Sequence, residues 1–271
     1  MKRILFVCIC IALLVCTSCS NQHDPYARFK GKDLNLKSGY KELFWFSGIH
    51  NNNPEHEMFD DIKDKFISFK PDLVLVEGNA NNKIYTSEIN AKLEGESAYV
   101  TYLSNESNIE IMSIEPPFEN QIQLLLKTYK EDDILAMYIL RQIYQIQREN
   151  QYVDINFFEY MVRYTEGLIT KESSYSNKDI DSDFIVRILE PHIKIMIDND
   201  NWKRVDAESI VYSDNGIINS IYTDVLKYRD EYSIDLISEK LKHYNRIFIM
   251  MGADHIKAQE EELRKIFDEI Q

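Results

Sequence analysis

Cysteine is scarce in this chain of 271 residues and is confined to its N-terminal segment. The four cysteines are Cys8, Cys10, Cys16 and Cys19. A folded domain that follows this segment therefore contains no disulfide, no thiolate nucleophile and no cysteine ligand for zinc. Its stability has to come from a packed core.

Glycine and proline are also rare, with eight and six residues. An all-β chain of short strands and tight turns needs more of both, so that class is disfavoured. The sequence also lacks a Gly-rich phosphate loop, a Gly-x-Ser-x-Gly elbow and a His-Glu-x-x-His helix. These absences disfavour nucleotide-dependent enzymes, serine hydrolases with a nucleophile elbow and zincins.

Positive charge is outweighed by negative charge, with 31 Lys and Arg against 45 Asp and Glu and a formal net charge of −14. Loss of a leader that contains Lys2 and Arg3 would move the net charge from −14 to −16. Such an acidic domain repels phosphate backbones, so we expect no nucleic-acid partner. It also disfavours broad contact with anionic lipid.

The N-terminal segment is typical of a secretion signal. Lys2 and Arg3 precede an apolar run over residues 4–15, which is too short for a permanent membrane span. The small residues before Cys19 resemble a bacterial lipobox, with Cys16 an unusual residue in it. We therefore predict a lipoprotein signal peptide at residues 1–18 and a lipidated Cys19, carrying palmitate, that anchors the chain in the bacterial cell envelope. An ordinary signal peptide cleaved nearby and an uncleaved anchor are the alternatives.

About 250 residues follow the signal, enough for one domain or for a domain with a large insertion. Residues 19–40 are polar and are predicted to form a tether. Residues 41–271 are predicted to form the folded domain. No internal repeat or low-complexity tract divides it.

Short apolar runs bounded by polar or turn residues predict four buried strands. They cover residues 43–46, 73–76, 109–114 and 247–251. Helical periodicity predicts helices over 54–69 (N-cap Asn53), 122–129, 134–146, 157–168, 185–197 with a break at Pro191, 218–228 and, after Asp254 as N-cap, up to 270. The predicted fold is α/β, with a central, mostly parallel sheet flanked by helices. A large helical insertion or cap, residues 117–244, separates the third and last core strands.

An ionisable side chain follows each predicted strand. These residues are His50, Glu77, Glu115 and His255. Open α/β sheets bind ligands beyond the carboxyl ends of their strands, so we expect the four side chains to meet in one site. Charged residues also commonly mark strand exits, and that explanation accounts equally well for any one of the four.

Two imidazoles and two carboxylates are suitable nitrogen and oxygen ligands for zinc, manganese or iron. A bound metal polarises a carbonyl or lowers the pKa of a water molecule. Without a metal, the same groups serve as general acid and base, because a His–Glu pair titrates near neutrality. The residues leave both mechanisms open.

Further polar residues have two interpretations each. His56, in the first turn of the predicted helix 54–69, lies near the same crevice or is a solvated first-turn histidine. Arg229, at the end of the predicted helix 218–228, binds an anionic substrate group or orients a carboxylate, or it is a surface arginine at a helix end. His192 and His243 are predicted to be structural or exposed. The tyrosines are predicted to pack in the core or the cap.

Three short motifs resemble those of the TraB/Tiki superfamily, whose wider relatives include erythromycin esterases and ChaN-like iron-regulated lipoproteins. They are the early histidine motif ending at His50, Leu75-Val76-Glu77, and Tyr228-Arg229-Asp230 followed by Met251-Gly252-Ala253-Asp254-His255. Gly252 matches the glycine expected three residues before the late histidine. At the early histidine Ser47 occupies that place and Gly48 follows. Residues 49–56, with two histidines around an Asn/Pro loop, look more like the ChaN pattern.

The resemblance, carried by short motifs over about residues 43–267, implies a central sheet with a site at its strand ends. The Tiki branch implies metal-dependent proteolysis, with His50, Glu77 and His255 at the matching positions. The ChaN branch implies haem or iron binding, for which His50 and His56 would be the ligands.

We therefore predict a membrane-tethered hydrolase that depends on a divalent metal (Mn, Zn, Co or Fe) and acts on a peptide or on a small-molecule amide or ester. His50, Glu77 and His255 would form its core and bind the metal, with Glu115 and Arg229 in support. The alternatives are a non-catalytic lipoprotein that binds haem or iron and a relative with neither activity.

Overall fold

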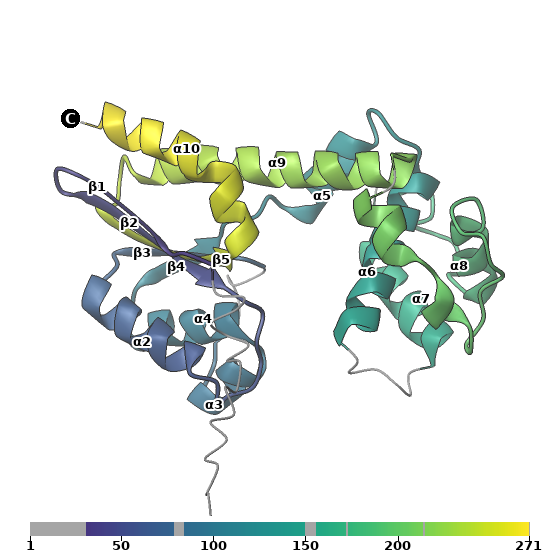
Figure 1. The fold of residues 1–271 in the computed structure, drawn as a ribbon, viewed down its shortest axis with the longest axis horizontal. Coiled ribbons are helices and arrows are strands. Elements are labelled where there is room, and N and C mark those ends of the chain that lie inside the picture. Colours follow the sequence, from purple (N-terminus) through teal and green to yellow (C-terminus); the bar gives the residue numbers. More distant parts are fainter. Residues whose placement is uncertain (1–30, 79–83, 150–155, 172, 214, 271) are drawn as a thin grey trace, which may run out of the picture.

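The computed structural model describes residues 31–78, 84–149, 156–171, 173–213 and 215–270. These residues form an α/β unit and a helical unit that share one long helix, α9 (Figure 1). The strands are β1 (Leu34–Ser38), β2 (Lys41–Gly48), β3 (Leu73–Val76), β4 (Glu110–Ser113) and β5 (Arg246–Gly252). The helices are α2 (Met58–Phe69), α3 (Glu88–Leu93), α4 (Glu96–Glu106), α5 (Phe118–Leu125), α6 (Glu131–Glu149), α7 (Phe157–Leu168), α8 (Ser182–Leu189), α9 (Ile217–Lys240) and α10 (Ala253–Glu269), with short η1 (Trp202–Arg204) and η2 (Ser209–Ser213).

The sheet has the order β1-β2-β5-β3-β4. The pairs β2–β5, β5–β3 and β3–β4 are parallel, and only β1–β2 is antiparallel within the described sheet. The predicted α/β class with a mostly parallel sheet is thus confirmed. The strand β1 was not expected: it lies inside the predicted tether of residues 19–40, so the boundary at residue 40 is wrong. Leu34 and Leu36 are buried, and their alternation with polar residues is the signal of a half-buried strand.

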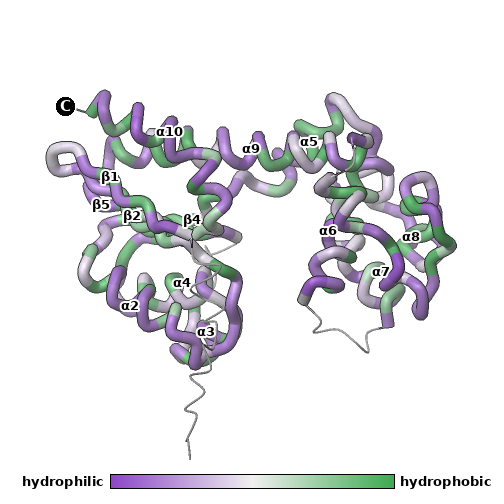
Figure 2. The backbone as a smooth tube through the Cα atoms, in the orientation of Figure 1, coloured by the Kyte–Doolittle hydropathy of each residue, from purple (hydrophilic) through white to green (hydrophobic). Residues whose placement is uncertain are grey.

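Side chains of the central strands alternate between two apolar layers. Phe44 and Phe46 of β2 pack with α2, α3 and α4 on one face, whereas Leu43 and Trp45 pack with α9 and α10 on the other. Figure 2 shows hydrophobic and hydrophilic residues alternating along the helices that cover the sheet. Burial on both faces explains why the central strands are near-continuous apolar runs. The edge strand β4 is only partly buried, which corrects the prediction of four buried strands.

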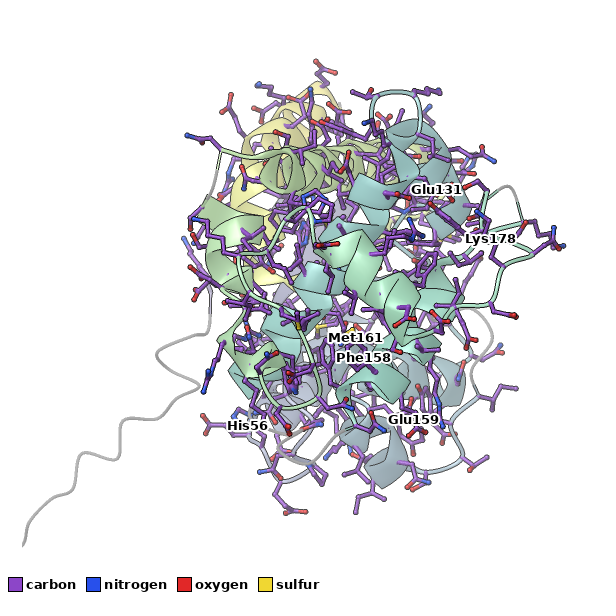
Figure 3. The ribbon with its side chains drawn as sticks, turned by 90° about the vertical axis from the view of Figure 1, so that its right-hand side faces the viewer. His56, Glu131, Phe158, Glu159, Met161 and Lys178 are labelled. Carbon is purple, nitrogen blue, oxygen red and sulfur yellow. The ribbon has the colours of Figure 1, made fainter. Side chains whose placement is uncertain are left out.

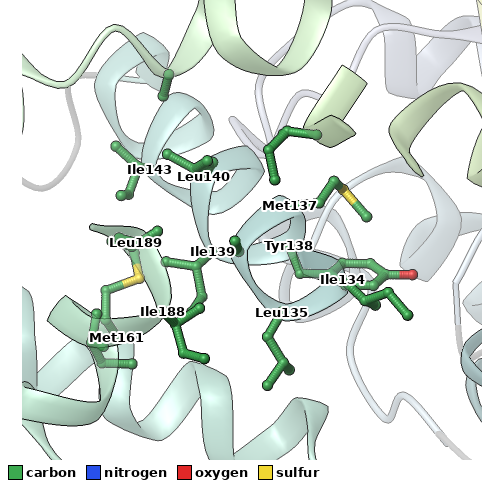
Figure 4. Packing of buried hydrophobic residues seen from close by; sticks show 14 of the residues in the cluster. Ile134, Leu135, Met137, Tyr138, Ile139, Leu140, Ile143, Met161, Ile188 and Leu189 are labelled. Carbon is green, nitrogen blue, oxygen red and sulfur yellow. The ribbon is translucent and has the colours of Figure 1, made fainter. Parts of the chain in front are cut away.

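The helical unit has a core of its own, built by α5 to α8 and the first half of α9. In Figure 4, Ile139 of α6 faces Met161 of α7 and Ile188 and Leu189 of α8. α9 joins this core to the sheet, because Ile221 packs in the helical unit and Ile237 packs against the sheet. The helix therefore ends at Lys240, well beyond the predicted end near residue 228.

Other predicted helix boundaries differ in the structure as well. The predicted helix 122–129 is α5, which begins and ends four residues earlier. Pro54 lies in a turn, and α2 begins only at Met58, because Asn53 accepts hydrogen bonds within that turn from Glu55 N and, through its carbonyl, from His56 N. α8 ends at Leu189, two residues before the helix-breaking Pro191. Asp254 is not the N-cap of α10, which begins at Ala253 and has an uncapped Gly252 before it.

Candidate functional site

The four predicted strand-end residues lie along one edge of the sheet. His50 follows β2, Glu77 follows β3 and Glu115 follows β4, while His255 is in the first turn of α10 after β5. Because these four strands are parallel, all four residues leave the sheet at its C-terminal edge. The register pairs Gly48 with Gly252, so the loops after β2 and β5 start side by side.

Gly252 marks the point at which three of these side chains converge. A Cβ built on Gly252 would lie 3.7 Å from His50 Nε2, 3.9 Å from Glu77 Oε2 and 4.0 Å from His255 Cδ2. The glycine thus leaves open a small space that two imidazoles and one carboxylate surround. The position of this glycine in the late histidine motif thus has a physical reason in the structure.

Arg229 joins the two glutamates of the site. Its Nη2 lies 3.0 Å from Glu77 Oε1 and also binds Glu115 Oε1. Gly78 N donates to the other Glu115 oxygen at 2.9 Å. Arg229 is buried in the middle of α9, so its interpretation as a surface arginine at a helix end is wrong. Its Nε is buried and makes no hydrogen bond among the described residues.

The charges around Arg229 stabilise its ion pairs. Burial raises the pKa of Glu77, but the positive charge of Arg229 and then the neighbouring His50 and His255 outweigh it and hold that pKa below its usual value. Burial lowers the pKa of Arg229, whereas Glu115 and Glu77 raise it by more. Both partners are therefore charged at neutral pH.

Glu96, at the start of α4, holds the loop that carries His50. Its carboxylate accepts hydrogen bonds from the backbone N–H groups of His50 at 2.8 Å and Asn51 at 3.2 Å, and Oε1 lies 3.1 Å from His50 Nδ1. His50 has the left-handed φ of +56°, an uncommon conformation for a residue other than glycine. The Glu96 contacts offset the cost of that conformation and direct Nε2 away from Glu96, toward Gly252.

The same contacts shift the ionisation of both partners. The hydrogen bond to Glu96, against a smaller effect of desolvation, raises the pKa of His50. Burial raises the pKa of Glu96, but the hydrogen bond from the His50 side chain and the charge of His50 more than reverse this effect and lower it. A Cβ at Gly48 would lie only 3.0 Å from Glu96 Oε1, so this glycine leaves room for the carboxylate. A Cβ added at Gly31 would clash with the side chain of Ser47.

Asp230 orients the imidazole of His255, as Glu96 orients that of His50. Its Oδ1 lies 2.7 Å from His255 Nδ1 and also accepts a hydrogen bond from Gln259 Nε2 at 2.8 Å. Ser233 Oγ in turn donates to Gln259 Oε1 at 2.9 Å. Because a carboxylate is only an acceptor, this arrangement places the proton of a neutral imidazole on Nδ1 and leaves Nε2 as the acceptor.

Sequence reasoning did not select Glu96 or Asp230 as site residues. In the sequence, Glu96 is indistinguishable from the acidic residues that commonly occupy the first turn of a helix. For Asp230 a weak signal was present: Asp230 and Ser233 are three residues apart, and His255 and Gln259 four apart, so each pair shares a helix face.

A cavity of about 490 Å³ opens at this edge, between the strand ends, the start of α4 and helices α5, α6, α7 and α9. His50, Glu77, Glu115 and Arg229 all line it. His255 and His56 are not among the lining residues. His56 is half-buried in the turn before α2, where its Nδ1 accepts a hydrogen bond from Met58 N at 3.2 Å (labelled in Figure 3). Cys19 and the predicted signal peptide lie outside the described residues.

In the described ranges no group of three or more His, Cys, Asp or Glu side chains meets the geometric requirements of a metal site. The donor types around Gly252, two imidazole nitrogens and a carboxylate oxygen, are nevertheless those that zinc, manganese and iron accept.

Comparison of the chain with protein families, with curated proteins and with solved structures found no match. Among the described helices, none combines the length and apolar character of a membrane span.

Proposed function

We propose that this protein is a hydrolase that cleaves a peptide, amide or ester bond at the C-terminal edge of its sheet. The observation that carries the proposal is the convergence of His50, Glu77 and His255 on the open space beside Gly252. Two further observations support it: each imidazole is fixed through Nδ1 by a carboxylate, and His50 and Glu77 line a cavity of substrate size.

The donor types of these residues suit a divalent metal. His50 Nε2, His255 Nε2 and Glu77 Oε2 would hold it, and Glu96 and Asp230 are the outer carboxylates that commonly orient metal-binding histidines. When bound, the ion supplies a Lewis acid that polarises the scissile carbonyl and lowers the pKa of a water molecule.

Other residues of the chain hold the three central side chains in position. Arg229 keeps Glu77 ionised and fixes its Oε1, so that Oε2 is the oxygen directed toward Gly252. Glu115 fixes Arg229 in turn, which makes both of them positioning residues. The Glu96 contacts hold the strained loop of His50 in place before any substrate arrives.

We further propose that residues 117–244 act as an inserted cap, which supplies one wall of the cavity and shields it from water. Phe118, Tyr138 and Tyr164 of this region line the cavity opposite the strand ends. The lipid on Cys19 would hold the enzyme at the membrane of the cell envelope. Cys19→Ala should then move the full-length chain from the membrane fraction of a bacterial lysate to the unbound fraction.

The test is to purify the chain without residues 1–18, measure its bound metal by mass spectrometry and assay it on peptides and esters. We expect His50→Ala and His255→Ala to lower both metal content and hydrolysis. His243→Ala is the matched control, because His243 is an exposed histidine just beyond the end of α9, where it lies near Glu239. Unchanged metal content and hydrolysis in both site variants would overturn the proposal.

The same preparation tests the haem alternative. In a titration with haem followed by visible absorbance, a Soret shift that His56→Ala abolishes would favour a binding protein over a hydrolase.

A further inference from the structure

The two walls of the cavity differ in their chemistry. The sheet side carries the glutamates and His50, and Arg229 there is already paired with Glu77 and Glu115. The helical side is largely aromatic and apolar, but it also contains a second cation, Arg141 of α6. Arg141 is half-buried and makes no ion pair with any carboxylate in the described part of the chain.

The surroundings of Arg141 are phenols. Tyr138 and Tyr164 line the cavity together with Arg141, and the charge of this arginine also acts on Tyr212 and Tyr222. Burial raises the pKa of Tyr138, Tyr164 and Tyr222 to about 12, and these phenols stay neutral at neutral pH. A guanidinium in a partly enclosed cavity, on a wall whose other side chains are neutral, has the chemistry of a receptor for an anion.

Tyr138 and Arg141 face the cavity together, since they are three residues apart on α6 and both line it. The Tyr138 phenol is also anchored, because it accepts a hydrogen bond from Gln121, another cavity residue. A planar guanidinium matches a carboxylate in a two-point contact, which a lysine does not reproduce.

We propose that Arg141 binds a carboxylate of the substrate, so that the enzyme acts on short peptides or acylated amino acids with a free carboxylate. The inference rests on the proposed hydrolase function, and it deepens that function by naming the substrate class. The carboxylate lies on the helical wall and the bond to be cleaved at the strand ends. The volume of about 490 Å³ suits a ligand of that size.

The test uses N-acetyl-dialanine and its C-terminal carboxamide, which differ only in the charge that Arg141 would recognise. The wild-type chain should bind and cleave the free acid about 10- to 100-fold better than the carboxamide. This factor corresponds to the free energy of one charge-assisted hydrogen bond. Arg141→Gln should abolish that preference and Arg141→Lys should keep part of it. Arg163→Gln, at an exposed arginine of α7, is the control and should keep all of it.

Calorimetric binding of N-acetyl-alanine separates this inference from the hydrolase proposal. If neither dipeptide is cleaved but the free acid binds in a manner that depends on Arg141, the hydrolase proposal fails and the carboxylate site stands. If the wild-type chain binds acid and amide equally well, or if Arg141→Gln and Arg141→Lys both keep the full preference, the carboxylate site is wrong.

Discussion

His255 Nδ1 lies 2.7 Å from Asp230 Oδ1, and this contact fixes which nitrogen of the imidazole faces the site. The two residues come from different helices, α10 and α9. Gln259 and Ser233 hold Asp230 on the same two helices, so the orientation of His255 depends on how α9 packs on α10. A local change in α9 therefore affects a residue of the sheet edge.

Asp230→Asn tests this dependence. The amide has the same shape but also offers a donor, so it favours the tautomer with the proton on Nε2, which then neither binds a metal nor accepts a proton. We expect a loss of about 10- to 100-fold in metal affinity or hydrolysis. The far-ultraviolet circular dichroism spectrum should not change.

Asp254→Asn is the matched control, because this aspartate lies one residue from His255 and its side chain is 96% exposed. Activity and metal content should match those of the wild-type chain. Equal losses in both variants would contradict a specific role for Asp230.

Much of the framework was predictable from the sequence, because it depends on local patterns. Apolar runs predicted the parallel strands, and their shared direction predicted that His50, Glu77, Glu115 and His255 would line one edge. The end of α9 was not predictable in this way. Its buried face changes from the helical core to the sheet near Arg229, so one helical periodicity does not continue through it.

The supporting carboxylates could not be predicted, because their partners are distant in the chain. Glu96 binds a backbone group 46 positions away, and Asp230 binds an imidazole 25 positions away. Only the packing of α4 against the sheet and of α9 beside α10 decides these contacts. The strand β1 was overlooked for a different reason: its polar, outward-facing residues made residues 34–38 resemble the tether.

Gly252→Ala should impair the site without destabilising the fold. The new methyl group would meet its neighbours at 3.7–4.0 Å, which is ordinary contact, and the φ of −57° suits alanine. The methyl nevertheless fills the space that His50, Glu77 and His255 surround. We expect metal binding and hydrolysis to fall at least about 10-fold, while the thermal unfolding midpoint changes little.

Gly167→Ala provides the comparison at a glycine with no neighbour within 4 Å of the added Cβ. This position is in the last turn of α7, where alanine is more favourable than glycine by at most about 0.5–1 kcal/mol, the figure for the middle of a helix. Its unfolding midpoint should rise slightly and its activity should be unchanged. A Gly252→Ala protein with full activity would refute the proposed position of the site.

Arg229→Met should destabilise the fold because it leaves two glutamates of the site without their cation. Removing one partner of a buried pair costs about 3–5 kcal/mol, and we expect the lower end because Glu77 and Glu115 are 22% and 23% exposed. The thermal midpoint should fall by about 6–12 °C. The double change Arg229→Met with Glu115→Gln should recover part of this loss, and a single variant as stable as the wild-type chain would contradict the ion-pair assignment.

His192 should make stability depend on pH independently of the candidate site. Burial lowers the pKa of His192, and the nearby Asp133, 3.2 Å from Nε2, opposes that effect only in part. Since the folded pKa lies below the unfolded value of about 6.5, the unfolded state takes up a proton first as the pH falls. Stability is therefore lost on acidification below about pH 6.5, with a slope of at most about 1.4 kcal/mol per pH unit from this group.

Measurements of urea unfolding between pH 8 and pH 5 test the direction of this pH dependence of stability. Relative to His192→Gln, the wild-type chain should lose more stability over that range, because glutamine takes up no proton. His243→Gln, at an exposed histidine, should follow the wild-type curve. A wild-type chain that gains stability relative to His192→Gln on acidification would mean that Asp133 outweighs burial and that His192 is charged in the folded protein.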